Sequence, residues 1–211
     1  LLITDYNMPR MNGFELVKNI RREISKNDLV IIGLSGEGDG KLTAKFIKNG
    51  ANDFLNKPFS HEEFHCRIIH NIETMEHVET IQHAAFHDYL TDLFNRRYFY
   101  DKGEEALALS HKNNTPTCLA LIDIDHFKKI NDAFGHDVGD AVLVDFANHL
   151  RSYVDDNGQL FRIGGEEFCV FMPAAQSQHW AETFCLFINN NTFESEGVEI
   201  HYTVSIGVAA S

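Results

Sequence analysis

The amino-acid sequence predicts an α/β protein in three consecutive parts: a doubly wound parallel sheet, a long helix, and an α+β domain with a mostly antiparallel central sheet. Three observations lead to this prediction. Strand-like and helix-like patterns alternate over residues 1–56, which is typical of a parallel sheet covered by helices. Residues 60–87 contain no proline or glycine and repeat apolar side chains every three or four positions. Residues 160–172 hold two apolar runs around a Gly-Gly pair, which indicates a hairpin.

The composition limits the class of protein. The 211 residues are 44% apolar, which suits one or two compact domains. Acidic residues outnumber basic ones by 31 to 18, and the net charge of −13 argues against binding to nucleic acid. No apolar run reaches the roughly 18 residues that cross a bilayer, and no leader-like pattern precedes the first strand, so no membrane insertion is expected. The four cysteines form no CxxC pair, which favours reduced thiols in a cytoplasmic protein.

The elements of the first part alternate in type. They are a strand over 1–5, a helix over 14–20, a strand over 29–34, a helix near 41–49 and a short strand over 53–56. In a parallel sheet, functional side chains lie at the carboxyl ends of the strands. Asp5, Ser35 and Lys57 fall at such ends.

The long helix begins at a capping box formed by Ser60 and Glu63. Its apolar stripe consists of Phe64, Ile68, Ile72, Met75, Val78, Ile81 and Ala85. The stripe could pack only on the helix's own domains, but a stripe of this length between two domains favours a dimerising stalk.

The hairpin carries the first carboxylate pair. Apolar runs over 160–163 and 168–172 flank Gly164 and Gly165, which can adopt the positive φ of a tight turn. Glu166 and Glu167 follow directly, and strand geometry would point them to opposite faces unless the turn re-aims one. By itself the hairpin fits a solvated acidic tip as well as it fits a site.

A second carboxylate cluster favours a site. Residues 118–122 form a continuous apolar run, typical of a strand buried on both faces, and Asp123 and Asp125 follow on one face. The helical stretch 140–154 would cover the sheet with a stripe of Val142, Phe146 and Leu150. Asp123 and Glu166 could meet as oxygen ligands of Mg²⁺, which predicts phosphoryl or nucleotidyl transfer.

Five motifs in this order over residues 86–211 resemble the GGDEF family of diguanylate cyclases, in its Glu variant. They are Asp88-Tyr-Leu90-Thr91-Asp-Leu93-Phe-Asn95-Arg96-Arg97, Asp123-x-Asp125-x-Phe127-Lys128-x-x-Asn131-Asp132, Gly135-His136-Asp137-x-Gly139-Asp140, Gly164-Gly165-Glu166-Glu167-Phe168 and Val204-Ser205-Ile206-Gly207-Val208. The resemblance implies a palm-like fold of the nucleotidyl cyclase type.

The resemblance also implies roles for individual residues. Asp123 and Glu166 would be the catalytic pair, and the metal ligands would be Asp123, the carbonyl of Ile124, Glu166 and Glu167. Two Mg²⁺ (or Mn²⁺) ions per active site would activate a 3′-hydroxyl and steady a triphosphate. The substrate-binding residues would be His126, Phe127 and Lys128 at the phosphates, Asn131 and Asp140 at the guanine edge, and Leu90 and Leu143 beneath the base. Asp140 favours GTP for both halves of the product.

The implied reaction condenses two GTP into cyclic di-GMP and two pyrophosphates. Because each monomer would hold one GTP, the resemblance implies a homodimer. Two alternatives are a catalytically inactive, GTP-binding and dimerising module, and a cyclase that acts within one nucleotide.

The first part resembles the later half of a response-regulator receiver domain. The matching contexts are Asp5-x-x-Met8-Pro9-x-Met11-Asn12-Gly13, Leu34-Ser35-Gly36 and Asn56-Lys57-Pro58-Phe59. The resemblance implies that Asp5 accepts a phosphoryl group from a bacterial sensor histidine kinase. The supporting residues would be Asn7 as a carbonyl ligand of Mg²⁺, Ser35 and Lys57 as phosphoryl contacts, and Phe54 as the switch aromatic.

The chain departs from both families at three places. It begins at the third receiver strand and so lacks the family's acidic pair and first two strands, without which normal Mg²⁺ binding and phosphorylation of the receiver are not expected. It stops directly after the late strand, before a helix that supplies a Lys and an Arg in the family. Asp155-Asp156-Asn157-Gly158 replaces the family's Arg-x-x-Asp, so no product-inhibition site is expected. The predicted domains are a partial receiver over 1–60, a stalk over 61–87 and a GGDEF domain over 88–211.

Overall fold

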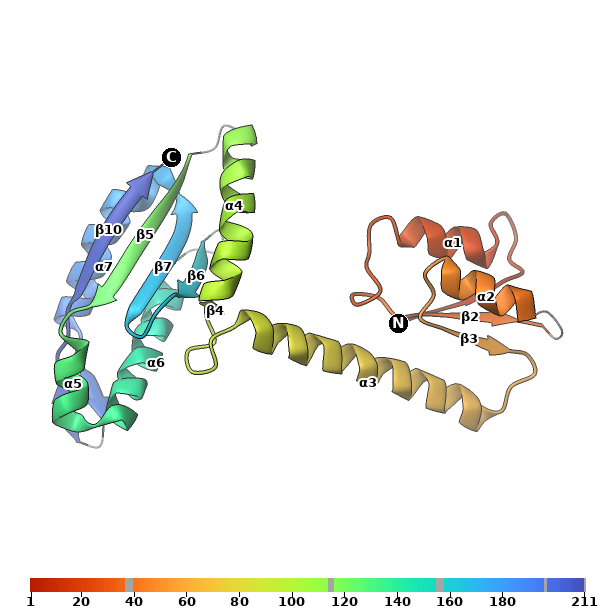
Figure 1. The fold of residues 1–211 in the computed structure, drawn as a ribbon, viewed down its shortest axis with the longest axis horizontal. Coiled ribbons are helices and arrows are strands. Elements are labelled where there is room, and N and C mark those ends of the chain that lie inside the picture. Colours follow the sequence, from red (N-terminus) through yellow and green to blue (C-terminus); the bar gives the residue numbers. More distant parts are fainter. Residues whose placement is uncertain (37–39, 114–115, 155–157, 196, 211) are drawn as a thin grey trace. The chain divides into compact units, whose positions relative to one another are not determined.

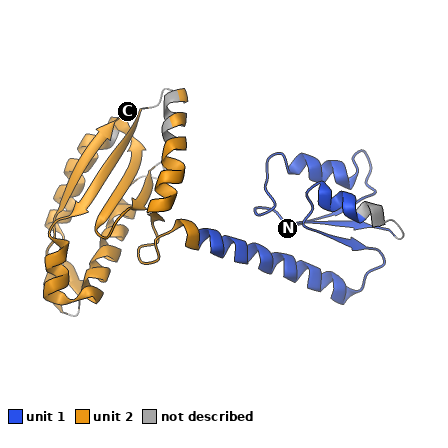
Figure 2. Ribbon diagram, in the orientation of Figure 1, with its two compact units in different colours: residues 1–83 blue, residues 84–211 orange. Residues whose placement is uncertain are grey.

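The computed structural model describes residues 1–36, 40–113, 116–154, 158–195 and 197–210. A parallel sheet, a long helix and a mixed sheet follow one another along the chain (Figure 1), which confirms the predicted fold class. The chain divides into two compact units, Leu1–His83 and Ala84–Ser211 (Figure 2).

The first unit has helices on both faces of a three-stranded sheet. Its elements are β1 (Leu2–Asp5), α1 (Gly13–Ile20), β2 (Ile31–Ser35), α2 (Gly40–Lys48), β3 (Asp53–Asn56) and most of α3 (His61–Phe86). The strands are all parallel in the order β1-β2-β3. Asp5 is opposite Leu34, and Ser35 is opposite Asn56, so the carboxyl ends of the three strands meet at one edge.

Helix α3 completes this unit. Ser60 Oγ accepts a hydrogen bond of 3.0 Å from the backbone N–H of Glu63, so the predicted cap is present on that side. The apolar residues of α3 that pack beneath the sheet, against Val30, Ile32 and Leu55, are Phe64, Ile68 and Met75. Part of the stripe therefore belongs to the core of the first unit, which explains why this unit extends past residue 60. A stalk role, and domain boundaries at 60 and 87, stay predictions.

The second unit contains the remaining elements. They are β4 (Phe94–Asn95), α4 (Arg96–Asn113), β5 (Thr117–Ile124), α5 (Phe127–Phe134), α6 (His136–Tyr153), β6 (Gln159–Arg162), β7 (Glu167–Pro173), η1 (Ala174–Gln176), α7 (Ser177–Asn190), β8 (Phe193–Ser195), β9 (Val198–Ile200) and β10 (Val204–Ala210). The main sheet has the order β10-β5-β7-β6-β4, with every pair antiparallel except β4 and β6. The short pair β8-β9 forms a separate ribbon.

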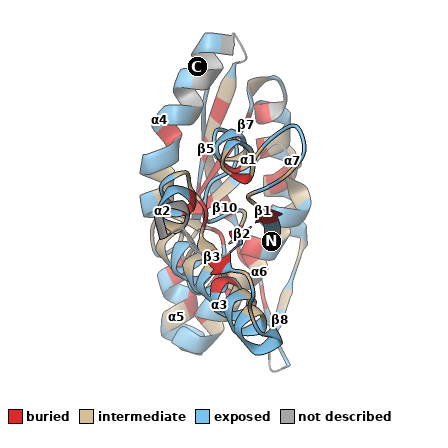
Figure 3. Ribbon diagram, turned by 90° about the vertical axis from the view of Figure 1, so that its right-hand side faces the viewer, coloured by how far each residue is buried: buried red, intermediate tan, exposed pale blue. Residues whose placement is uncertain are grey.

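Side-chain alternation along the strands divides the core of the second unit between the two faces of the sheet. On one face Ala120, Ile122 and Val170 pack under α6 and α7, and on the other face Phe161 and Phe171 pack under α4. Buried residues occur along the strands and at single positions of the helices (Figure 3). The predicted stripe of Val142, Phe146 and Leu150 is fully buried, which confirms that α6 covers the sheet.

One expectation about the hairpin turn is wrong. Gly164 and Gly165 do not adopt positive φ, whereas His126 and Gly135 do, at 58° and 89°. At Gly164 the missing side chain matters instead, because a Cβ there would lie 2.2 Å from Oε2 of Glu167. Gly164 therefore leaves room for the carboxylate of Glu167 to lie against the backbone of the turn.

Among the described residues, no helix combines the length and the apolar character that crossing a membrane requires. All four cysteines carry free thiols, and Cys118 and Cys169 lie buried in strands as expected.

Candidate functional site

The edge of the first sheet gathers the predicted receiver residues. Asp5 ends β1, and Lys57 follows β3 and donates a hydrogen bond to the Asp5 carboxylate. This bond, with a further one of 3.3 Å from the backbone N–H of Asn7, holds the pKa of Asp5 below its ordinary value. Ser35 is buried at the end of β2, and its carbonyl accepts a 2.7 Å bond from the N–H of Lys57. The predicted phosphoacceptor thus has a cation at contact distance.

Phe54 lies inside the first unit. It is 6% exposed, and its ring centroid lies 5.3 Å from that of Phe46 on α2. The switch role predicted for Phe54 is untested and stays a prediction.

The carboxylates of the second unit meet where β5 ends and β7 begins. Asp123 stands directly opposite Glu167 in the antiparallel register, so these two side chains share a face of the sheet. The backbone of Glu166 is bonded to the residue after Asp123, because the Glu166 carbonyl accepts a 3.3 Å hydrogen bond from the N–H of Ile124. The sequence pointed to Asp123 with Glu166, whereas the structure places Glu167 opposite Asp123 and joins Glu166 to this strand end through its backbone.

The electrostatics of this cluster suit a cation. Burial raises the pKa of Asp123, and the nearby carboxylates of Glu167 and Asp125 raise it further. Like charges at this range are relieved when a cation is shared. Carboxylate and carbonyl oxygens are the ligands of hard divalent ions such as Mg²⁺, so this donor set fits the metal that the resemblance implies.

The loop after β5 and the start of α5 hold the predicted phosphate contacts. His126 is exposed and has the left-handed φ of 58°, Phe127 is buried, and Lys128 is exposed on the first turn of α5. The first N–H groups of a helix have no partner within the helix and favour anions. The loop and this helix start therefore present donors and a cation within a few residues of Asp123.

The predicted base contacts come from three elements. Asn131 on α5 lies against α6, since a Cβ on Gly139 would come within 1.8 Å of Asn131 Oδ1. Asp140 follows Gly139 and lines, with Leu90, a cavity of about 520 Å³. Leu143 is 2% exposed and belongs to the core, and Val144 lines the cavity instead. The role of Leu143 under the base stays a prediction.

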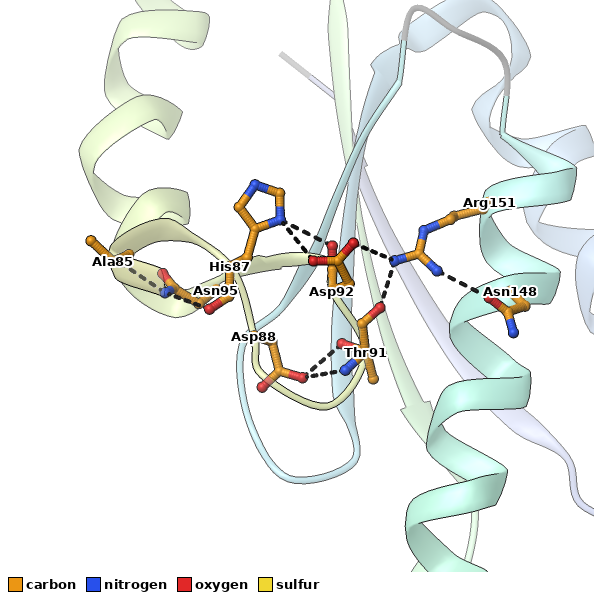
Figure 4. Close-up of polar contacts among 8 residues, drawn as sticks. All are labelled: Ala85, His87, Asp88, Thr91, Asp92, Asn95, Asn148 and Arg151. Atoms are coloured by element: carbon orange, nitrogen blue, oxygen red, sulfur yellow. Dashed lines mark hydrogen bonds and ion pairs between the residues drawn. The ribbon is translucent and has the colours of Figure 1, made fainter. Parts of the chain in front are cut away.

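Sequence reasoning missed a polar hub at the turn after α3. Asp88 Oδ1 accepts bonds from the backbone N–H and the hydroxyl of Thr91, at 2.9 and 2.7 Å (Figure 4). Arg162 also donates to Asp88 Oδ1, at 2.8 Å, and to the carbonyl of Gly165, at 2.8 and 3.2 Å. Asp88 opens the first motif and Arg162 stands two residues before the Gly-Gly pair. The only signal in the sequence was that Asp88 opens one motif and that Arg162 lies just before another.

Figure 4 also shows how the turn is fastened to α6. Arg151 donates a 2.5 Å bond to the carbonyl of Thr91 and lies 4.0 Å from the carboxylate of Asp92. Asn95 holds the other side of the turn by donating to the carbonyls of Ala85 and His87.

Asp125 differs from its neighbour Asp123. Hydrogen bonds from the hydroxyls of Ser205 and Thr203 hold the pKa of Asp125 below its ordinary value. The two aspartates of the predicted pair therefore have different environments, and only Asp123 faces another carboxylate across the strands. Of the positions compared with the product-inhibition motif, 155–157 lie outside the described residues.

Comparison with known proteins identifies the family of each part of the chain. A family model described as "Diguanylate cyclase, GGDEF domain" matches residues 85–211, and one described as "Response regulator receiver domain" matches residues 1–69. The response regulator PleD of Caulobacter vibrioides is 32% identical over 223 residues, which cover 100% of this chain and 49% of PleD. The diguanylate cyclase DgcM of Escherichia coli is 38% identical over 150 residues, which cover 67% of this chain and 35% of DgcM.

Among solved structures, the coiled coil and GGDEF domain of DgcB from Caulobacter crescentus, in complex with c-di-GMP, is similar with a TM-score of 0.65. The sequences are 29% identical, and the match covers 72% of this chain and 84% of that one. The chain spans about half the length of PleD. The chain belongs to the GGDEF family of diguanylate cyclase domains, and its first 69 residues match the response-regulator receiver family.

Proposed function

We propose that the protein condenses two molecules of GTP into cyclic di-GMP and two pyrophosphates. The observation that carries this proposal is the pair of facing carboxylates of Asp123 and Glu167, with Glu166 joined to Ile124 through its backbone, beside a helix start in a chain of this family. Each of the two steps forms one phosphodiester bond and releases one pyrophosphate, so two GTP-loaded subunits must face each other.

The residues divide the work by their position. Asp123, Glu166 and the carbonyl of Ile124 would hold divalent ions, Mg²⁺ or Mn²⁺, with Glu167 as a further ligand. Such ions, when bound, lower the pKa of the attacking 3′-hydroxyl and neutralise the triphosphate. Lys128 and the backbone amides of His126 and Phe127 would bind the phosphate oxygens.

Guanine recognition falls to Asn131 and Asp140. A carboxylate accepts hydrogen bonds from the N1–H and exocyclic amine of guanine, and adenine offers neither in that arrangement. Leu90 would pack against the base from the wall of the cavity.

Control of the reaction would come from the first unit. A phosphoryl group on Asp5 would add negative charge beside Lys57, and Ser35 would donate to one of its oxygens. We expect a sensor histidine kinase as the phosphoryl donor, a homodimer as the active form and the cytoplasm as the compartment.

The product assay tests the proposal directly. The protein is incubated with GTP and Mg²⁺ and the products are identified by mass spectrometry. We expect cyclic di-GMP from the wild type and at least about a 100-fold lower rate from Glu166→Gln, because a group that acts on the developing charge is lost. Glu194→Gln, an exposed carboxylate change on β8, should leave the rate unchanged.

Other products would point to other functions. A cyclic mononucleotide would show a cyclase that acts within one nucleotide. Tight binding of GTP without any product would show the inactive, dimerising module and would contradict the proposal.

Gly139→Ala should weaken GTP binding without unfolding the domain. The new methyl group would overlap Asn131 Oδ1, at 1.8 Å, and push the carboxamide away from the base. Loss of one hydrogen bond to the base corresponds to about tenfold in affinity. Calorimetric titration with a non-hydrolysable GTP analogue measures this effect.

Gly103→Ala is the matched control for that substitution. Gly103 is a buried helical glycine, but a Cβ there would lie 3.5 Å from Phe171, an ordinary contact distance. We expect wild-type affinity from this variant. Equal affinity of Gly139→Ala and wild type would show that Asn131 does not contact the nucleotide.

A further inference from the structure

The loop that joins β5 to α5 consists of Asp125 and His126 and has an unfavourable shape. His126 has a φ of 58°, a left-handed conformation that costs energy for a residue with a side chain. No side chain caps the start of α5. Such a conformation persists only when contacts around it hold the backbone in place.

Those contacts come from the chain at β10. The carboxylate of Asp125 accepts 2.6 Å hydrogen bonds from two hydroxyls, with Thr203 at Oδ2 and Ser205 at Oδ1. The backbone N–H of Asp125 adds a 2.9 Å bond to the carbonyl of Thr203. Three bonds thus bind one loop residue to two residues of a neighbouring segment.

The spacing of the partners explains the arrangement. Ser205 is opposite Asp123 in the register of β10 and β5, and Thr203 precedes it by two positions. Residues two apart in an extended chain face the same side, as do Asp123 and Asp125. The hydroxyls of Thr203 and Ser205 therefore lie on the same face of the sheet as Asp123 and Asp125, and both donate to Asp125.

We infer that Asp125 is a positioning residue whose bonds to Thr203 and Ser205 hold the β5-α5 loop in the shape that binds the metal ion and the triphosphate. This inference rests on the proposed function, in which Ile124 and His126 act through their backbones. Asp125 fixes the backbone between them. Its oxygens already accept hydroxyl hydrogen bonds, and the metal-facing acid is Asp123.

The test compares substitutions that keep or remove these bonds in the full 211-residue chain. Asp125→Ala removes both hydrogen bonds to the carboxylate and leaves the backbone bond to Thr203. Asp125→Asn can keep both, because a hydroxyl can donate to its oxygen and accept from its amide. Thr203→Val with Ser205→Ala removes the partners and leaves the charge, and Glu104→Ala on the exposed side of α4 is the control.

Two readouts are measured: the kcat and KM for GTP, and the affinity for Mn²⁺ titrated in the presence of a non-hydrolysable GTP analogue. Removing a group that orients metal ligands typically lowers affinity or activity 10- to 100-fold, so we expect roughly this loss of kcat and Mn²⁺ affinity for Asp125→Ala and for the double variant. The KM for GTP should rise by no more than about tenfold, because the loop amides at the triphosphate are disturbed while the side chains that contact the base are unchanged. Asp125→Asn should recover to within about tenfold of wild type.

Three results would overturn the inference. Equal loss from Asp125→Asn and Asp125→Ala would show that the charge itself acts, as in a direct ligand. Unchanged kcat and Mn²⁺ affinity with a lower melting temperature would show a role in stability alone. A double variant with wild-type Mn²⁺ affinity would show that the hydroxyls do not matter.

The Mn²⁺ titration separates this inference from the proposed function. A wild type that makes no cyclic di-GMP but binds Mn²⁺ would contradict the proposed reaction, and the order of Mn²⁺ affinities among the variants would still decide the role of Asp125. A wild type that binds no Mn²⁺ would overturn both.

Discussion

Asp123→Asn is expected to abolish cyclic di-GMP synthesis and, at the same time, to make the metal-free protein more stable. The carboxylate of Asp123 faces Glu167 across β5 and β7, and its pKa is raised by burial and by the neighbouring acids. A neutral amide removes the repulsion and also removes the proposed metal ligand. We expect a rate at least about 1,000-fold lower, since an electrostatic contact to the reacting groups is lost.

The stability of this variant is measured by urea unfolding without divalent ions. Burial of part of the Asp123 carboxylate raises its pKa, but most of both side chains is exposed and solvent screens their repulsion, so the gain in unfolding free energy should be small, about 0.5 kcal/mol. Glu167→Gln should give a similar gain because it relieves the same repulsion, whereas Glu104→Gln should give none. A less stable Asp123→Asn protein, or one with wild-type turnover, would contradict the metal-site assignment.

Arg162→Ala should destabilise the second unit more than any other substitution considered for this chain. The side chain of Arg162 is 10% exposed, and it pairs with Asp88, whose side chain is 17% exposed. Removing one partner of a buried pair leaves an uncompensated charge and costs about 3–5 kcal/mol. The same change frees the carbonyl of Gly165 in the turn before Glu166, so turnover should fall as well.

Differential scanning calorimetry measures this loss as a melting temperature lower by roughly 10–20 °C. Adding Asp88→Asn to Arg162→Ala should restore part of the stability, because the amide carries no charge and can still accept from Thr91. Arg97→Ala is the control, since Arg97 is 72% exposed and lies 3.8 Å from Asp101. Equal melting temperatures for Arg97→Ala and Arg162→Ala would contradict the assignment.

The same pair predicts a dependence on pH. Burial raises the pKa of Asp88, but the bonds from Arg162 and Thr91 outweigh burial and hold the pKa below its ordinary value. The stabilisation is therefore present above the unfolded pKa of about 4 and is lost as the pH falls through the lower folded value. This part of the acid sensitivity should be absent from the double variant.

Much of the architecture follows from local sequence patterns. Alternation of strands and helices predicted the parallel sheet, and the stripe of Val142, Phe146 and Leu150 predicted the covering face of α6. Such patterns are readable because periods of 2.0 and 3.6 residues record which side of an element is buried. The long helix was predicted over 60–87 and runs over His61–Phe86.

The apolar stripe of α3 shows what hydrophobic periodicity cannot predict. Repeating apolar residues predict that one face of a helix is buried, but they do not predict which element or subunit covers it. Phe64, Ile68 and Met75 turned out to lie under the first sheet, while Ile81 is 67% exposed. The sequence favoured a dimer partner for the whole stripe, whereas in the structure part of the stripe packs under the first sheet and Ile81 is exposed.

By itself, the sequence determined the three-part fold, the family motifs and the identity of the acids at the ends of β5 and β7. Only the tertiary structure decided how those acids are arranged: Glu167 faces Asp123, Asp125 binds Thr203 and Ser205, and Arg162 joins Asp88 to the hairpin turn. The reason is physical, because register and loop shape bring together residues up to 80 positions apart. Chain spacing records the period of an element, whereas these contacts depend on how separate elements pair.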